Sequence, residues 1–182
     1  MEVLNEYTKE SVIEHQNDKE YLLKMVKNRP YTLLIDFASD EMKNDRELMI
    51  EAVKTVGGAL EFASNKLKDD YELVLEAVKA DGWVLCYASE RLRNEKEIVL
   101  TAVKKNGQGL YYASQALRDD EDIVLTAVQN KGLIFKYASR RVRGIKKVAL
   151  TAMENDIRAK SYVDEFLKDD EDIKNFGKDL TN

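Results

Sequence analysis

Several residue types are nearly missing from this chain. Its 182 residues include one cysteine, Cys86, one histidine, His15, one proline and one tryptophan. A lone cysteine excludes an intrachain disulfide and a zinc site built from several thiolates, and it fits a reducing, cytoplasmic setting. A lone histidine leaves the serines without a base beside them, which argues against hydrolytic catalysis. We therefore expect no enzyme activity, no metal site and no cofactor.

Long apolar runs are also missing. No uncharged apolar stretch approaches the roughly 20 residues that a membrane helix needs. The first residues, MEVLNEYTKESVIEHQ, contain no basic segment followed by an apolar one, so we expect no export signal. The formal net charge of -5 weighs against binding of nucleic acid or of an anionic membrane. These features predict a soluble cytoplasmic protein that does not bind membranes.

The sequence contains instead a repeat of 25 residues. An aromatic residue precedes Ala-Ser five times at this spacing, at Phe37, Phe62, Tyr87, Tyr112 and Tyr137. At Tyr162 the column continues, but Val-Asp replaces Ala-Ser there. Self-similarity at a period of about 20 to 50 residues is typical of solenoids and other repeat folds.

Each copy has the same order of features, as in NEKEIVLTAVKKNGQGLYYASQALR, residues 94–118. Capping-box spacing predicts a helix start at each of Asn44, Asp69, Asn94, Asp119 and Asp169. A glycine follows the last apolar residue of each predicted helix, and it predicts a turn with positive φ at Gly57, Gly82, Gly107 and Gly132. The rest of the copy, such as 109–118, predicts a second, continuous helix.

These patterns predict the fold class. The apolar residues of the first helix spread over more than half of its circumference, which predicts an inner helix, whereas the second helix has the narrow apolar stripe of an outer one. Helices of this length are marginal alone in water, so neighbouring pairs must stabilise one another. We expect an all-α single domain: a right-handed α-solenoid of about six antiparallel helix pairs over residues 17–169, with capping helices over 1–16 and 170–182.

The unit LRDDEDIVLTAVQNKGLIFKYAS, residues 117–139, carries the acidic cap, the VLTAV segment, the glycine turn and the YAS triplet in order. It resembles the α-helical tandem repeats catalogued as domain of unknown function 4116, and the resemblance covers roughly residues 40 to 155. What it implies is a helical repeat of unassigned role. No catalytic or ligand-binding residues come with it.

Aromatic side chains are the first candidates for binding. The rings of Tyr87, Tyr112 and Tyr137 either fill the seam between successive outer helices, the interpretation that we favour, or form an exposed ladder that stacks on a peptide or on bases. Trp83 lies at a position that varies between copies and is a candidate interface anchor.

The second candidate is the stretch RRVRGIKK, residues 140–147, where the capping acids of the other copies are gone. It is a candidate un-neutralised site for an anion, a phosphate or an acidic partner, although the interpretation that we favour is drift of a solvated loop. Its five cations are Arg140, Arg141, Arg143, Lys146 and Lys147.

The function that the sequence favours is a non-enzymatic helical-repeat scaffold or protein–protein interaction module, a monomer or weak oligomer with a protein or peptide partner of unknown identity. A stack of helix pairs presents an extended surface on which the variable positions select the partner. The alternative is a nucleic-acid-binding helical repeat that uses the aromatic ladder and a basic column, against which the net charge weighs.

Overall fold

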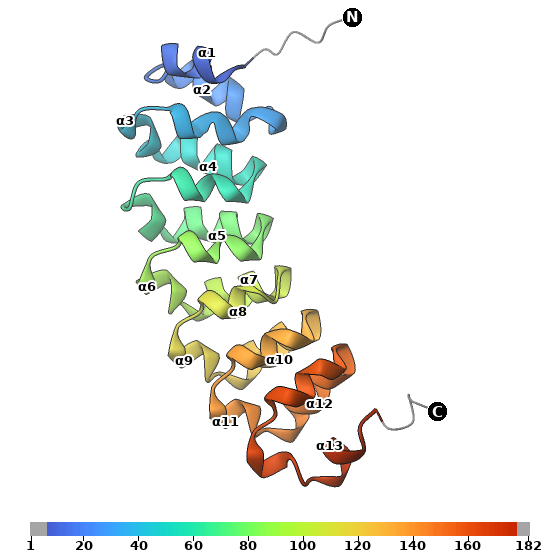
Figure 1. Ribbon diagram of the computed structural model, residues 1–182. Helices are drawn as coiled ribbons and strands as arrows, with labels where there is room; N and C mark the ends of the chain where they lie inside the picture. Colours follow the sequence, from blue (N-terminus) through green and yellow to red (C-terminus); the bar gives the residue numbers. More distant parts are fainter. Residues whose placement is uncertain (1–6, 178–182) are drawn as a thin grey trace, which may run out of the picture. The chain divides into compact units, whose positions relative to one another are not determined.

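The computed structural model describes residues 7–177, which form α-helices, 3₁₀ helices and turns, with no β-strand in that range (Figure 1). The chain divides into two units, residues 1–92 and 93–182, which are described separately. The prediction of an all-α chain is confirmed for the described residues. None of their helices has the length and the apolar composition that crossing a membrane requires.

The elements are named as in Figure 1, with η for 3₁₀ helices. Unit 1 contains α1 (Lys9–Glu14), α2 (Lys19–Val26), η1 (Arg29–Phe37), α3 (Asp40–Lys43), α4 (Arg46–Thr55), η2 (Gly57–Phe62), η3 (Leu67–Asp69), α5 (Tyr71–Ala80) and η4 (Gly82–Tyr87), and α6 (Glu90–Arg93) crosses the boundary. Unit 2 contains α7 (Lys96–Lys105), α8 (Gly109–Tyr112), α9 (Gln115–Arg118), α10 (Glu121–Asn130), η5 (Gly132–Tyr137), α11 (Arg140–Arg143), α12 (Lys146–Asn155), η6 (Ile157–Tyr162), η7 (Glu165–Leu167) and α13 (Glu171–Asn175).

The two predicted capping helices are shorter than expected. The first, expected over 1–16, is found as α1, and the last, expected over 170–182, is found as α13. Residues 1–6 and 178–182, on which the remainder of these predictions falls, lie outside the described residues.

Each copy consists of three helical segments, and the prediction of one continuous second helix is wrong. In the copy 94–118, Ala113 and Ser114 have extended backbone between α8 and α9, with ψ of 153° and 160°. The Ser114 hydroxyl accepts a hydrogen bond from the Leu117 N–H at 3.2 Å, so the serine starts a new helix. Its own N–H donates to the Arg93 carbonyl of the preceding copy at 3.0 Å. The Ala-Ser pair is thus a helix break that joins copies.

The long helices begin one residue later than predicted. Asp70 caps α5 by accepting from the Leu73 N–H at 2.9 Å, and Asp120 caps α10 in the same way. The predicted cap residues accept hydrogen bonds from serine hydroxyls 20 residues later instead, as Asn94 does from Ser114 at 2.6 Å. Two adjacent aspartates fit the capping pattern at 69–70 and at 119–120, and the backbone conformation selects the second of them.

Glycine has a different role from the predicted one. Gly177 is the one described residue with positive φ, so the glycines after the long helices do not form left-handed turns. A Cβ on Gly57 would lie 2.7 Å from the Ala77 carbonyl oxygen of the next long helix, and a Cβ on Gly107 would lie 2.6 Å from that of Ala127. These positions exclude a side chain because successive copies approach at that point.

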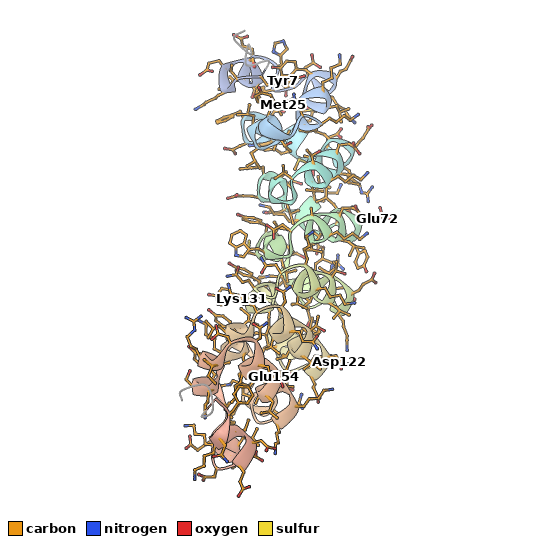
Figure 2. The ribbon with its side chains drawn as sticks, turned by 90° about the vertical axis from the view of Figure 1, so that its right-hand side faces the viewer. Tyr7, Met25, Glu72, Asp122, Lys131 and Glu154 are labelled. Atoms are coloured by element: carbon orange, nitrogen blue, oxygen red, sulfur yellow. The ribbon has the colours of Figure 1, made fainter. Side chains whose placement is uncertain are left out.

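Packing within each unit runs from copy to copy. In unit 1, α4 packs against α2 and α5, and in unit 2, α10 packs against α7 and α12 (Figure 1). Each long helix buries one stripe, which in α4 consists of Leu48, Met49, Ala52 and Val53. Its other side remains in solvent, as Figure 2 shows for Glu72, Asp122 and Glu154 on the later long helices. The predicted division into inner and outer helices is therefore not found.

A charged pair also links successive long helices. Where the first residue of a long helix is a cation, it contacts the capping aspartate of the next long helix, as in Arg46–Asp70 at 2.8 Å in unit 1 and Lys96–Asp120 at 2.7 Å in unit 2. The Arg46 guanidinium holds the pKa of Asp70 below its usual range, because its hydrogen bond favours the charged carboxylate.

Candidate functional site

The aromatic column is half buried in both units. In unit 1 the Tyr87 hydroxyl donates to Glu61 at 3.0 Å, and its ring packs edge-on against Trp83 with the centroids 5.7 Å apart. Trp83 itself is 36% exposed. The candidate anchor and the column therefore contact each other and form one small aromatic patch.

In unit 2, Tyr112 and Tyr137 are half buried as well, and the exposed ring is one that the sequence analysis did not select. Tyr111 is 49% exposed and packs between the other two, with centroids 4.8 Å from Tyr112 and 4.6 Å from Tyr137. The ammonium group of Lys136 lies 4.8 Å from the Tyr137 centroid. Rings of adjacent copies thus contact each other, and both rings of the column keep part of their surface exposed.

The basic junction, defined as Arg140, Arg141, Arg143, Lys146 and Lys147, occupies α11 and the start of α12 in unit 2. The expectation that its charge is not neutralised is wrong. Acids come from the neighbouring copies, which lie 22 to 26 residues away in sequence and next to the junction in space. The ion pairs are Arg140–Asp164 at 2.9 Å, Arg141–Asp119 at 3.0 Å, Lys146–Asp170 at 2.9 Å and Lys146–Asp172 at 2.6 Å.

Lys146 and Arg143 each contact the following copy. Lys146 takes the place of Lys96 in the pairs between long helices, and Arg143 donates from Nη1 to the Tyr162 carbonyl at 3.4 Å. Lys147 is exposed and has no ion pair within residues 7–177. It stands in a column that elsewhere holds Glu97 and Asp122, so the charge is reversed at this position.

A second substitution changes the surface beside Arg140. In two earlier copies an aspartate pairs with the arginine 22 residues later, Asp69 with Arg91 in unit 1 and Asp119 with Arg141 in unit 2. In the next copy both partners are replaced, by Gly144 and Phe166. Both the acid and the cation of this pair are therefore absent from that copy.

The replacement leaves a hollow, which we call the Phe166 pocket. Its volume is about 470 Å³, and its lining consists of Arg140, Arg141, Gly144, Asp164 and Phe166. The Phe166 side chain is 84% exposed, the most exposed large apolar side chain of the described residues, and the Arg140 guanidinium carbon lies 5.6 Å from its ring centroid. An exposed ring beside cations is typical of a surface that binds another molecule.

Asp164 holds Arg140 in place beside this pocket. It stands where earlier copies have serine, and it accepts from the Phe166 N–H at 3.3 Å. The hydrogen bond from Arg140 lowers the pKa of its carboxyl group, and the exposed fraction of the side chain is 6%. Asp164 therefore stays charged at neutral pH and holds Arg140 at the rim of the pocket.

The sequence analysis singled out the arginines of this pocket and missed Asp164 and Phe166. The signal in the sequence was that the aspartate column and the arginine column both change in this copy, at Gly144 and Phe166. Their spacing alone does not show that the two columns are partners. None of the described residues forms a group of three or more His, Cys, Asp or Glu side chains placed to hold a metal ion.

Tandem copies of one helical unit, joined by hydrogen bonds and ion pairs between adjacent copies, define a helical tandem-repeat protein. The chain belongs to the family described as domain of unknown function (DUF4116), whose model matches residues 18–68, 70–118 and 95–143. This match confirms the resemblance expected from the YAS repeat. No curated protein and no solved structure is significantly similar to the chain.

Proposed function

We propose that this protein is a non-enzymatic interaction module that binds a protein or peptide partner through the Phe166 pocket and the adjoining basic junction. The observation that carries the proposal is the exposed ring of Phe166 beside Arg140. Covering a ring of this size contributes about 1.5–3 kcal/mol, whereas exposed ion pairs contribute little. The ring is therefore the anchor of the proposed contact, and the cations orient the partner.

The proposed scaffold is a right-handed solenoid of about six copies, each made of one long helix and two short helical segments. The support for it is the copy-to-copy packing of long helices within each unit and the recurrent close contact at the glycines. A stack of this kind presents neighbouring copies on one surface, so a partner can contact several of them.

The absence of an enzymatic activity is part of the proposal. The repeated serines accept backbone N–H groups at helix starts, and His15 is engaged at the end of α1, where its Nδ1 lies 2.8 Å from the Ser11 carbonyl oxygen. Burial raises the pKa of the Cys86 thiol to about 11, so that it is protonated at neutral pH. The Cys86 thiol is therefore a poor nucleophile.

The test is selection of peptides from a phage-displayed library of random dodecapeptides. Wild-type protein is expected to enrich specific sequences, and Phe166→Ser is expected to lose them. Leu33→Ser is the matched control, because Leu33 is also an exposed apolar side chain, at 49%, in unit 1. Enrichment of the same peptides by the Phe166→Ser variant would contradict the proposal.

Nucleic-acid binding is the second candidate, and the exposed Tyr111 ring next to Lys136 and Tyr137 favours it. The pairing of Arg140, Arg141 and Lys146 with carboxylates weighs against it, because fewer cations are free to contact phosphates. Titration of single-stranded RNA at low salt decides between the two, since phosphate contacts predict strong binding that falls steeply with added salt.

A further inference from the structure

A second hollow adjoins the Phe166 pocket and shares Arg140 with it. We call it the Arg118 pocket. Its volume is about 250 Å³, and its lining consists of Gln115, Arg118, Tyr137, Ala138, Ser139 and Arg140. The lining contains two arginines and no carboxylate, so the pocket is built to favour a negative charge.

Arg118 differs from the other arginines around it. Arg140 and Arg141 each pair with an aspartate, and Arg143 donates to a carbonyl group. The side chain of Arg118 forms no ion pair within residues 7–177, and its Nε, like that of Arg143, is buried without a hydrogen-bond partner. Arg118 is half buried and lines the hollow, so a carboxylate that enters the hollow can accept hydrogen bonds from its guanidinium group.

The sequence explains why the arginine has no acid. The same positions two copies earlier, in unit 1, hold Lys68 in place of Arg118 and Glu90 in place of Arg140. In unit 2 the acid at this position is replaced by a cation, so the positive charge around the hollow is doubled. The next copy compensates Arg140 through Asp164, and nothing among the described residues compensates Arg118 in the same way.

We infer that the Arg118 pocket receives the carboxylate of an acidic peptide segment whose neighbouring apolar side chain covers Phe166. The inference rests on the proposed function and specifies the partner's chemistry. The guanidinium group matches a carboxylate in a bidentate arrangement, and the shared Arg140 places the two pockets within reach of adjacent peptide residues. The carboxylates of Asp119 and Asp164 border the same surface, and they repel a polyanion more strongly than a single carboxylate.

The experiment uses the full chain and dodecapeptides selected by phage display on the wild-type protein. Each peptide is synthesised with blocked ends, together with a partner in which Asp and Glu are replaced by Asn and Gln. The selected peptides are expected to share an acidic residue, and its amide replacement is expected to weaken binding about tenfold, the loss of one charge-assisted pair. The dissociation constants are measured by fluorescence anisotropy.

Variants of the arginine test the pairing directly. Arg118→Gln is expected to weaken the acidic peptide about tenfold and to leave the amide peptide unchanged, so that the two changes are not additive. Arg118→Lys is expected to retain part of the affinity, because it keeps the charge and loses the bidentate geometry. Lys68→Gln, at the same repeat position in unit 1, is the matched control and is expected to bind like wild type. Thermal unfolding verifies that each variant is folded.

Each contrary outcome has a definite meaning. Loss of peptide binding in Phe166→Ser together with unchanged binding in Arg118→Gln overturns the carboxylate site and leaves the interaction module intact. If the library yields the same sequences for wild type and for Phe166→Ser, both the carboxylate site and the interaction module are overturned. If single-stranded RNA competes with the peptides, a peptide is not the occupant of the Arg118 pocket. The same conclusion follows if light scattering shows a dimer that the Arg118→Gln substitution dissociates.

Discussion

One pair of repeat positions is occupied by an ion pair in unit 1 and by Gly144 and Phe166 in unit 2. In unit 1, Asp69 accepts hydrogen bonds from the Ser89 hydroxyl and from the Arg91 guanidinium, and the layer is closed by its own side chains. In unit 2, Gly144 and Phe166 occupy the equivalent positions, and a hollow with an exposed ring takes the place of the pair. Where the repeat is complete, its polar groups satisfy one another. Where Gly144 and Phe166 replace the pair, an apolar ring is left exposed beside a hollow.

The largest effect on stability is expected at the close contact between Gly57 and the next long helix. Gly57→Ala places a Cβ 2.7 Å from the Ala77 carbonyl oxygen, so the neighbouring copies must separate. We expect the free energy of unfolding to fall by about 2–3 kcal/mol, measured by urea denaturation. Gly58→Ala is the adjacent control, because the nearest atom to its Cβ would be 3.9 Å away, on Val56. Equal stability of the two variants would show that close approach does not hold the layers together.

The second prediction converts the open layer into a closed one. Gly144→Asp combined with Phe166→Arg restores the pair that Asp119 and Arg141 form one copy earlier. Binding of selected peptides is expected to weaken at least about tenfold, because the apolar anchor is lost. The free energy of unfolding is expected to change by less than about 1 kcal/mol, since the new pair is exposed. Retained peptide affinity in the folded double variant would place the binding surface elsewhere.

The third prediction concerns acid stability. Hydrogen bonds from Arg46 and Arg140 lower the pKa values of Asp70 and Asp164 in the folded chain. Carboxylates with lowered pKa values stabilise the fold above the unfolded-state value of about 4, and this stabilisation is lost as the pH falls through the folded-state values. Unfolding measured between pH 7 and pH 2 is expected to show the loss, and Asp70→Asn is expected to reduce its size.

Glu10→Gln is the control for this series, because Glu10 is exposed and forms no ion pair with the described residues. Its pH dependence is expected to match that of wild type. A wild-type stability that stays constant down to pH 2 would refute the contribution of the two aspartates.

The smallest effect is expected at Cys86, in the half-buried seam of unit 1. Burial raises the pKa of its thiol to about 11, so very little thiolate is present at neutral pH. Alkylation by iodoacetamide is expected to be slow at pH 7 and to accelerate up to about pH 11, as followed by mass spectrometry. Rapid labelling at pH 7, at a rate near that of free cysteine, would show that this seam is open.

The repeat and its helices were predictable because they depend on local and periodic properties. The 25-residue spacing, the apolar pattern and the acidic residues before each long helix require only the nearby chain. The one-residue error in the caps and the missed break at Ala113-Ser114 have another cause. Ser114 joins the Arg93 carbonyl and the Asn94 side chain, about 20 residues earlier, and no local rule connects these positions.

The candidate site was predictable only in part. The arginines of α11 stood out as a break in the charge pattern, and two of them line the Phe166 pocket. Their neutralisation was not predictable, because Asp119 and Asp164 lie more than 20 residues away on either side. Nothing in the local sequence distinguishes Phe166 from a buried apolar residue, so its 84% exposure was not predictable.

The sequence by itself determined the helical class, the repeat length, the family and the positions where the copies differ. The tertiary structure decided which of two adjacent polar residues caps a helix, why glycine is required, and which charges remain unpaired. The physical reason is that capping and apolar periodicity act within one or two turns of chain. Close approach and ion pairing depend instead on residues that stacking brings together from adjacent copies.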